Sequence, residues 1–393
     1  GMRADILALA FMGFCVVYDL TVYSASILLY IQSLVASEDQ ASFIFSIVIS
    51  TSALMQVTFS AACGYLARIF SMKGVFIALQ LSGTLGIMIY AFSEWPLGTA
   101  WGIVIGRGLF GVTAASFGLA LSYISTVAED KTERAALIAN FRGATILAAI
   151  PSSIMSLILA LPVLEFNIGS YQFNAYTYPA WSSLCLQIIS VTVNIMFLRN
   201  VEASSSKPSQ PSLEPTKHIY VSTGVLLILS IFFFNGYFLS ALTYALPIVM
   251  LEGYGWSIVQ YAPVWFGVSV VGLLSVLLTK YLAKRLGQFF YIIIVPGLGV
   301  MAIMTVFLCI GSVGTGKLPT GLGEAMFLIG AETSFAAFQV IQTGLSSIFS
   351  QIIPPVFIIR MMPLTSGMFA LGKICGPLVC EIQVAIAGIG CIF

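Results

Sequence analysis

Apolar stretches long enough to cross a lipid bilayer recur along the whole chain, and they constrain its fold more than any other feature. Of the 393 residues, 59% are hydrophobic and only 8% are charged, against about 25% charged in a typical soluble domain. A helix needs roughly 20 apolar residues to span the hydrocarbon, and the sequence has no alternating pattern typical of a membrane barrel. We therefore predict an all-α, multi-pass membrane protein with eleven spans, near residues 6–33, 41–63, 75–93, 100–126, 135–161, 180–198, 219–250, 262–279, 289–311, 324–350 and 364–387.

Basic residues fall almost entirely on one side of these spans. If the N-terminus lies in the cytosol and the spans alternate, twelve basic residues lie in cytosolic segments, and only Lys317 lies on the other side. Cytosolic loops of membrane proteins carry such an excess of Lys and Arg, so we expect a cytosolic N-terminus. The twelve residues are Arg3, Arg68, Lys73, Lys131, Arg134, Arg199, Lys207, Lys217, Lys280, Lys284, Arg285 and Arg360.

The same short basic phrase occurs in each half of the chain. Residues 65–68 read Tyr-Leu-Ala-Arg, within GYLARIFSMKG, and residues 281–284 read Tyr-Leu-Ala-Lys. Each phrase follows the second span of its half, which indicates repeated helical units. We interpret the first phrase as a tight turn that Gly64 permits and that Arg68 and Lys73 hold in the cytosol.

A polar segment separates the two halves. Residues 199–218 are rich in Ser, Pro and Lys, a composition typical of a linker. We therefore predict an N-terminal six-helix bundle over residues 1–198, a cytosolic linker over 199–218 and a C-terminal bundle with five spans over 219–393.

The sequence lacks the motifs of most enzymes and metal sites. The seven cysteines are scattered without a Cys-x-x-Cys pair, and the single histidine, His218, lies beside the polar segment. No Walker loop, HExxH, GxSxG or dinucleotide fingerprint is present. We expect no enzymatic activity, cofactor, metal or nucleic acid partner; the expected partners are a small-molecule or ion substrate and the lipid bilayer, with the protein as a monomer.

Several stretches resemble a known family. GYLARIFSMKG is similar to the loop between helices 2 and 3 of the major facilitator superfamily, and IGRGLFGVTAAS, residues 105–116, is similar to its helix 4 motif. GRGLFGVTAASFGLALSYISTVAEDKTERAALIA (106–139), the stretch at 176–200 and KICGPL (373–378) resemble the subfamily of the lysosomal transporter mutated in a neuronal ceroid lipofuscinosis. The resemblance implies a two-bundle helical fold in which spans 1, 4, 7 and 10 line a central cavity.

The chain departs from these relatives at four points. Arg68 stands where the superfamily's loop carries an acid, and span 5 lacks the Gly-Pro of the subfamily. Span 7 has Leu242 where the subfamily has an acid, so proton coupling through that helix is not implied. The superfamily has twelve helices, so we expect the twelfth to be missing or truncated here.

Four ionisable residues stand out inside the predicted spans: Asp19, Arg107, Glu332 and, less deep, Lys373. Such residues cost about 2.5–3.5 kcal/mol each at membrane depth, so they are candidates for substrate or ion binding. Arg107 could hold a substrate carboxylate or bind backbone carbonyls of span 1, whereas Asp19 could pair with Arg107, carry protons or cap a kink. Glu332 could couple protons, contact substrate or pair with Arg107 or Lys373. Lys373 precedes a Gly-Pro break, which leaves structural and ligand-binding roles equally open.

Span 7 is aromatic and carries three further candidates. Asn235, Tyr237 and Tyr244 could contact an organic substrate if this helix lines a cavity. A stripe of aromatic residues is more usually explained by packing alone. The sequence does not decide between these interpretations.

These observations predict a secondary transporter or facilitator that moves a small solute, with anions among the candidates, by alternating access. The resemblance implies an endolysosomal membrane. Two alternatives remain open: an anion channel on the same fold, and a membrane adaptor or degenerate transporter that moves nothing.

Overall fold

The protein is described by a computed structural model that covers residues 4–23, 26–94, 96–128, 131–159, 166–168, 171–174, 176–200, 223–286, 292–313, 320–354 and 357–387. Within these residues, eleven helical segments are long and apolar enough to cross a membrane. Each one overlaps a predicted span, so the predicted all-α membrane architecture is confirmed. The linker predicted at residues 199–218, with His218, lies outside the described residues from position 201 onward.

Six spans precede the linker region and five follow it. The first six comprise α1 (Ala4–Val22) with α2 (Ile27–Leu34), α3 (Glu38–Ile69), α4 (Met72–Ala91), α5 (Trp101–Ala114) with α6 (Ser116–Val127), α7 (Lys131–Leu147) with α8 (Ala149–Leu159), and α9 (Tyr178–Phe197). The last five comprise α11 (Thr223–Pro247) with the π-helix η2 (Ile248–Gly253), α12 (Ile258–Leu286), α13 (Ile294–Val313), α14 (Thr320–Ile352) and α15 (Ile358–Ala387).

Helices dominate because every backbone polar group in a bilayer must be bonded within the protein. The two helices of the α3–α4 hairpin begin with serine caps. Ser37 accepts a hydrogen bond from the backbone N–H of Gln40, and Ser71 accepts one from that of Gly74. These caps satisfy N–H groups that the first helical turn leaves unpaired.

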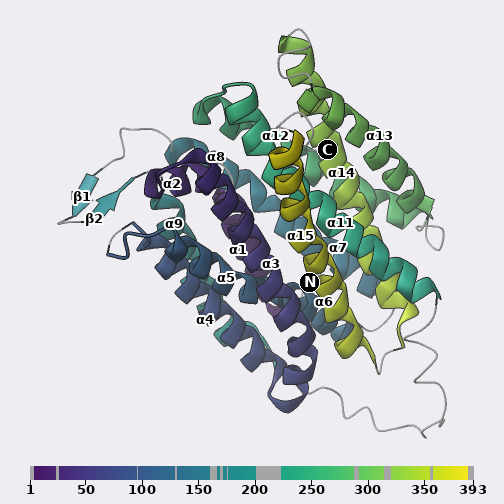
Figure 1. Cartoon of the computed structure of the whole chain (residues 1–393). Coiled ribbons are helices and arrows are strands. Elements are labelled where there is room, and N and C mark those ends of the chain that lie inside the picture. Colours follow the sequence, from purple (N-terminus) through teal and green to yellow (C-terminus); the bar gives the residue numbers. More distant parts are fainter. Residues whose placement is uncertain are drawn as a thin grey trace, which may run out of the picture.

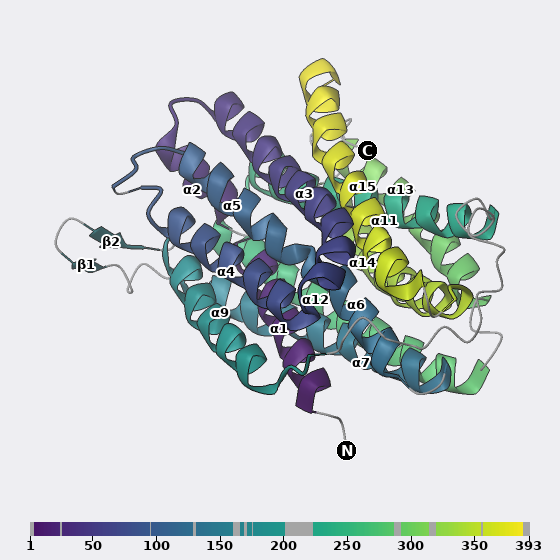
Figure 2. The same ribbon diagram turned by 90° about the horizontal axis from the view of Figure 1, so that it is seen from below.

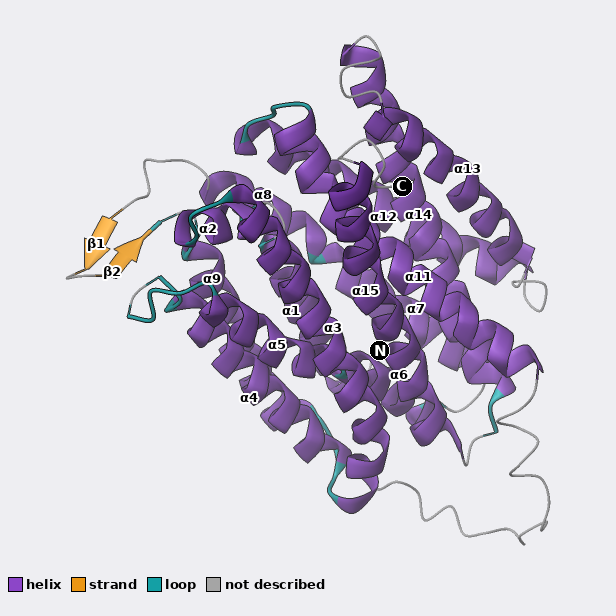
Figure 3. Cartoon of the chain, in the orientation of Figure 1, coloured by secondary structure: helices purple, strands orange, loops and turns teal. Residues whose placement is uncertain are grey.

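The long helices run side by side, with the N-terminal group on one side of the molecule and the C-terminal group on the other (Figure 1). Seen from below, α15 lies between α3 and α11 (Figure 2), and it packs extensively against both. The strands β1 (Phe166–Ile168) and β2 (Tyr171–Phe173) form an antiparallel hairpin that projects from one end of the bundle (Figure 3). We call this end the hairpin end, and the end with the α3–α4 connection the opposite end.

Helix α15 approaches α11 closely because glycines line their contact. A Cβ atom on Gly236 would overlap the carbonyl oxygen of Phe369, and one on Gly372 would overlap that of Phe233. Close helix approach through small residues is a common basis of packing in membranes, where the hydrophobic effect does not drive helices together.

The structure corrects the interpretation of Gly64 as a turn residue. Gly64 is buried inside α3, and the chain turns only at Phe70 and Ser71. A Cβ atom on Gly64 would lie 2.9 Å from the carbonyl oxygen of Ile359, so the glycine instead permits close contact between α3 and the start of α15. The physical reason is that glycine serves both turns and helix contacts, and the two uses look alike in sequence.

The repeated basic phrases lie in the last turns of helices rather than in loops. Arg68 is exposed in the last turn of α3, and Lys73 donates a hydrogen bond to the carbonyl oxygen of Ile195 in α9 at 2.6 Å. Directly after the second phrase, the Arg285 guanidinium lies 5.0 Å from the ring centroid of Tyr281, near the end of α12. Arg68 and Arg285 therefore lie at helix C-termini, where positive charge complements the helix dipole, whereas Lys73 lies in the first turn of α4.

Candidate functional site

A cavity lies between the N-terminal and C-terminal groups of helices. Its volume is about 240 Å³, and its wall combines α1–α3 and α5–α8 with α11, α12, α14 and α15. Most lining side chains are apolar or aromatic, as in sites that bind small organic molecules. Buried apolar residues pack in two clusters, and both contribute to the wall, for example Phe45 and Trp265 from one and Leu121 from the other.

The charged residues that line the cavity are all basic. Arg107, Arg142 and Lys373 line it, and no Asp or Glu of the described chain does so. The charges that line the cavity interact strongly with a bound ligand, because electrostatic interactions are stronger where water is excluded. The cavity therefore favours a ligand with negative charge.

Arg107 is neutralised by an acid behind the wall. Its guanidinium bonds to the Asp19 carboxylate at 2.7 Å, and the two residues are 7% and 1% exposed. The guanidinium also lies 4.8 Å from the ring centroids of Tyr23 and Phe110. The predicted pairing of Asp19 with Arg107 is thus confirmed, and this pair brings almost no net charge to the cavity.

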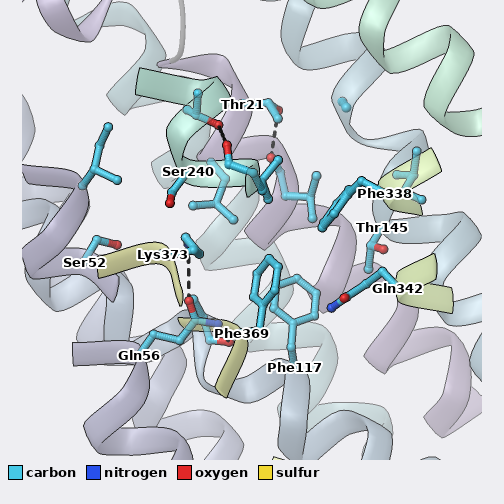
Figure 4. A pocket seen from close by; sticks show the side chains of 18 of the residues that line it. Thr21, Ser52, Gln56, Phe117, Thr145, Ser240, Phe338, Gln342, Phe369 and Lys373 are labelled. Atoms are coloured by element: carbon cyan, nitrogen blue, oxygen red, sulfur yellow. Dashed lines mark hydrogen bonds between the residues drawn. The ribbon is translucent and has the colours of Figure 1, made fainter. Parts of the chain in front are cut away.

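Lys373 enters the cavity from α15 without an acidic partner among the described residues. Its ammonium donates a long hydrogen bond, 3.4 Å, to the amide oxygen of Gln56 (Figure 4). The Gln56 amide nitrogen is held in turn by the Ser366 hydroxyl at 3.2 Å. Because its hydrogen-bond partner is a neutral amide, the Lys373 ammonium has no counter-ion in the described chain and is open to pairing with an anionic ligand.

Arg142 on α7 is a second cation without an acidic partner in the described chain. Its guanidinium donates to the Ser346 hydroxyl of α14 at 3.2 Å, and its Nε–H forms no hydrogen bond with any described residue. Arg142 was not among the residues predicted from the sequence, because it lies near the end of a span, where charged residues are common. The signal that would have found it is its depth, about three helical turns from the start of α7.

Comparison with known proteins identifies the fold. The family model described as Major Facilitator Superfamily matches residues 9–382. This chain belongs to the Major Facilitator Superfamily. Members of this superfamily are membrane transporters rather than enzymes, and this chain is therefore assigned as a membrane transporter. None of the curated proteins matches its sequence at a significant level.

Two solved structures are similar to this major facilitator along nearly their whole length. One is the human organic anion transporter MFSD10 (TETRAN), with a TM-score of 0.70, 14% sequence identity, and coverage of 99% of this chain and 95% of that one. The other is the proton:xylose symporter XylE bound to 6-bromo-6-deoxy-D-glucose, with a TM-score of 0.65, 14% identity, and coverage of 99% and 98%. At these identities the likeness establishes the fold.

Glu332 does not line the cavity of this major facilitator. It lies on α14 against α12, where a Cβ atom on Gly267 would come within 2.6 Å of its carboxyl oxygen Oε1. Its carboxyl is half-buried and forms no hydrogen bond or ion pair with any other described residue. The partners expected from the sequence, Arg107 and Lys373, bind Asp19 and Gln56 instead.

The three span 7 candidates also lie outside the cavity wall. Tyr237 lies close to Cys375 and Cys380 of α15. Asn235 is fully buried, and neither its amide oxygen nor its amide nitrogen forms a hydrogen bond with any described residue. Cavity contacts from α11 come from Leu239, Ser240 and Thr243.

Tyr244 links helices at the hairpin end. Its hydroxyl donates to the Glu381 carboxylate of α15, and its ring stacks on Phe45 of α3 with the centroids 5.6 Å apart. At the opposite end, Arg134 of α7 donates to the Ser350 carbonyl of α14 at 2.8 Å. Contacts between the N-terminal and C-terminal helices therefore occur at both ends of the bundle.

Proposed function

We propose that this protein is a secondary transporter that carries a small organic anion across the membrane by alternating access. The observation that carries the proposal is the central cavity, with its apolar wall and two cations, Lys373 and Arg142, that no acid of the described chain neutralises. An apolar wall suits the body of an organic molecule, and a guanidinium or ammonium suits its acidic group. The solved structure of an organic anion transporter with a similar fold is in keeping with this proposal.

Alternating access would use the two groups of helices as two bundles, over residues 1–198 and 219–393, joined by the linker at 199–218. Each bundle would rock about the central site while contacts at one end break and those at the other end form. The Phe45–Tyr244 stack at the hairpin end and the hydrogen bond from Arg134 to Ser350 at the opposite end are the contacts expected to alternate. This motion would involve Gly64, Arg68 and Lys73 at the opposite end, where α3 connects to α4.

The proposed location rests on the sequence. The bias of basic residues supports a cytosolic N-terminus, and the resemblance to the subfamily of the neuronal ceroid lipofuscinosis transporter supports an endolysosomal membrane. An anion channel is the second candidate function, because the same cationic lining would also stabilise a permeating anion.

The test is uptake by the purified protein in liposomes, with and without a pH gradient. Labelled p-aminohippurate, xylose and tetraethylammonium represent an organic anion, a neutral sugar and an organic cation. We expect saturable uptake of the anion alone, and a weaker signal from Lys373→Gln. Equal uptake of xylose or tetraethylammonium would contradict the proposal, and Arg285→Gln, which changes an exposed arginine outside the cavity, is the matched control.

A further inference from the structure

The two unneutralised cations of the cavity lie at separate places in its wall. Lys373 lies with Gln56 and Ser52 on one side, and Thr145 and Gln342 lie on the other side (Figure 4). Arg142 belongs to the second group, because its guanidinium donates to the Ser346 hydroxyl at 3.2 Å, and this hydroxyl donates to the Gln342 carbonyl one turn away on α14 at 2.8 Å. We call these groups the lysine pole and the arginine pole.

An aromatic surface separates the two poles. Phe117 and Phe369 lie between them in the close-up (Figure 4). The Lys373 ammonium lies 5.9 Å from the ring centroid of Phe369, and the Phe369 ring lies 6.0 Å from that of Phe338 on α14. The middle of the cavity therefore offers apolar and aromatic contacts rather than hydrogen bonds.

The arginine pole has unused hydrogen-bonding capacity. The Nε–H of Arg142 forms no hydrogen bond with any described residue. A buried donor without a partner is costly, so an anionic group that reaches this pole would gain free energy by accepting this hydrogen bond. Gln342, which lines the cavity beside it and is 5% exposed, adds a polar side chain to this pole.

We infer that the cavity selects an organic dianion, with one acidic group at each pole and an apolar body between them. This inference rests on the proposed function and narrows it to a substrate class. A monoanion can satisfy only one pole and leaves the other cation without an acidic partner. A dianion of the right length satisfies both, so affinity should depend on the distance between its acidic groups as well as on their number.

The test measures binding of alkane-α,ω-disulfonates, from propane to octane, to the purified protein in lipid nanodiscs by calorimetry. Sulfonates stay ionised, which separates the effect of charge from protonation, and the corresponding monosulfonates provide the comparison. We expect affinity to peak at one intermediate length. At that length the disulfonate should bind about tenfold or more tightly than the monosulfonate, the gain expected of one additional charge-assisted hydrogen bond.

Variants at each pole should remove this preference. Lys373→Gln and Arg142→Gln should each bring the ratio of the two affinities close to one while monosulfonate binding persists at the remaining pole, which also reports that the variant is folded. Arg142→Lys keeps the charge and should retain much of the preference. Arg285→Gln should leave the ratio unchanged.

The outcomes separate this inference from the proposed function. Equal binding of mono- and disulfonates by the wild-type protein at every length, or an unchanged ratio in Lys373→Gln, overturns the dianion inference and leaves organic anion transport intact. Failure of the wild-type protein to bind any sulfonate contradicts both.

Discussion

The carboxylate of Asp19 on α1 and the guanidinium of Arg107 on α5 form a buried ion pair, 2.7 Å between Oδ2 and the guanidinium nitrogen, behind the wall of the central cavity. The pair joins the first and fourth spans. A Cβ atom on the neighbouring Gly106 would come within 2.6 Å of the Gly86 carbonyl oxygen of α4, so close helix packing holds α5 in place. The pair therefore stabilises the packing of the helices around the cavity. The net charge of the cavity wall comes from other residues, Lys373 and Arg142.

Removing one partner of this pair should destabilise the protein more than removing both. Arg107→Gln leaves a buried carboxylate and should cost about 3–5 kcal/mol, because an unpaired charge then stays in a low-dielectric site. Asp19→Asn combined with Arg107→Gln should recover much of that loss. Thermal melting of the purified variants, followed by size-exclusion chromatography, measures the coupling. Strictly additive losses in the double variant would show that the two residues are not coupled.

The glycines between α11 and α15 should not tolerate even a methyl group. Gly372→Ala and Gly236→Ala place a Cβ atom on a backbone carbonyl of the facing helix, and the resulting shift should cost about 1–3 kcal/mol. Gly299→Ala on α13 is the matched control, because a Cβ atom at this position would meet open space. Melting temperatures measure the effect. A Gly372→Ala protein as stable as the control would show that α11 and α15 do not pack this closely.

Glu332→Gln tests whether this acid couples protons to transport. The carboxyl forms no hydrogen bond or ion pair within the described chain, and glutamine keeps its shape while removing its titration. If Glu332 is the coupling acid, the variant should lose the pH dependence of uptake and keep the exchange of preloaded substrate. The measurement is uptake in liposomes across a series of external pH values, with wild-type protein as the reference. A normal pH profile in the variant would exclude Glu332 and leave Asp19 as the next candidate.

The sequence predicted the spans well because the bilayer imposes a single requirement on them. Each span had to be long and apolar, and all eleven were found. The breaks within spans were harder to predict. Span 1, expected as one helix, is divided into α1 and α2, and span 4 is interrupted at Ala115, since tertiary packing decides where an apolar helix bends.

The candidate site was only partly predictable, because depth in the membrane can be read from sequence but helix rotation cannot. Asp19, Arg107 and Lys373 were found by their depth. Glu332 is equally deep, yet its side chain lies against Gly267 of α12, outside the cavity wall. Arg142 lies as far inside its predicted span as Arg107 does, but it was assigned to the cytosolic end of that span, and the sequence does not show that its side chain reaches the cavity.

The central claim is that this protein carries an organic anion by alternating access, and exchange across a liposome membrane tests it most directly. Vesicles containing the purified protein are preloaded with unlabelled p-aminohippurate, and the entry of the labelled compound is timed against empty vesicles. A carrier whose site faces one side at a time returns faster when loaded, so preloading should accelerate uptake, and Lys373→Gln should weaken the acceleration while Arg285→Gln preserves it. Uptake that neither saturates nor responds to preloading would contradict this claim and indicate a channel. Uptake no greater than that of protein-free vesicles would also contradict it and indicate a protein that transports nothing.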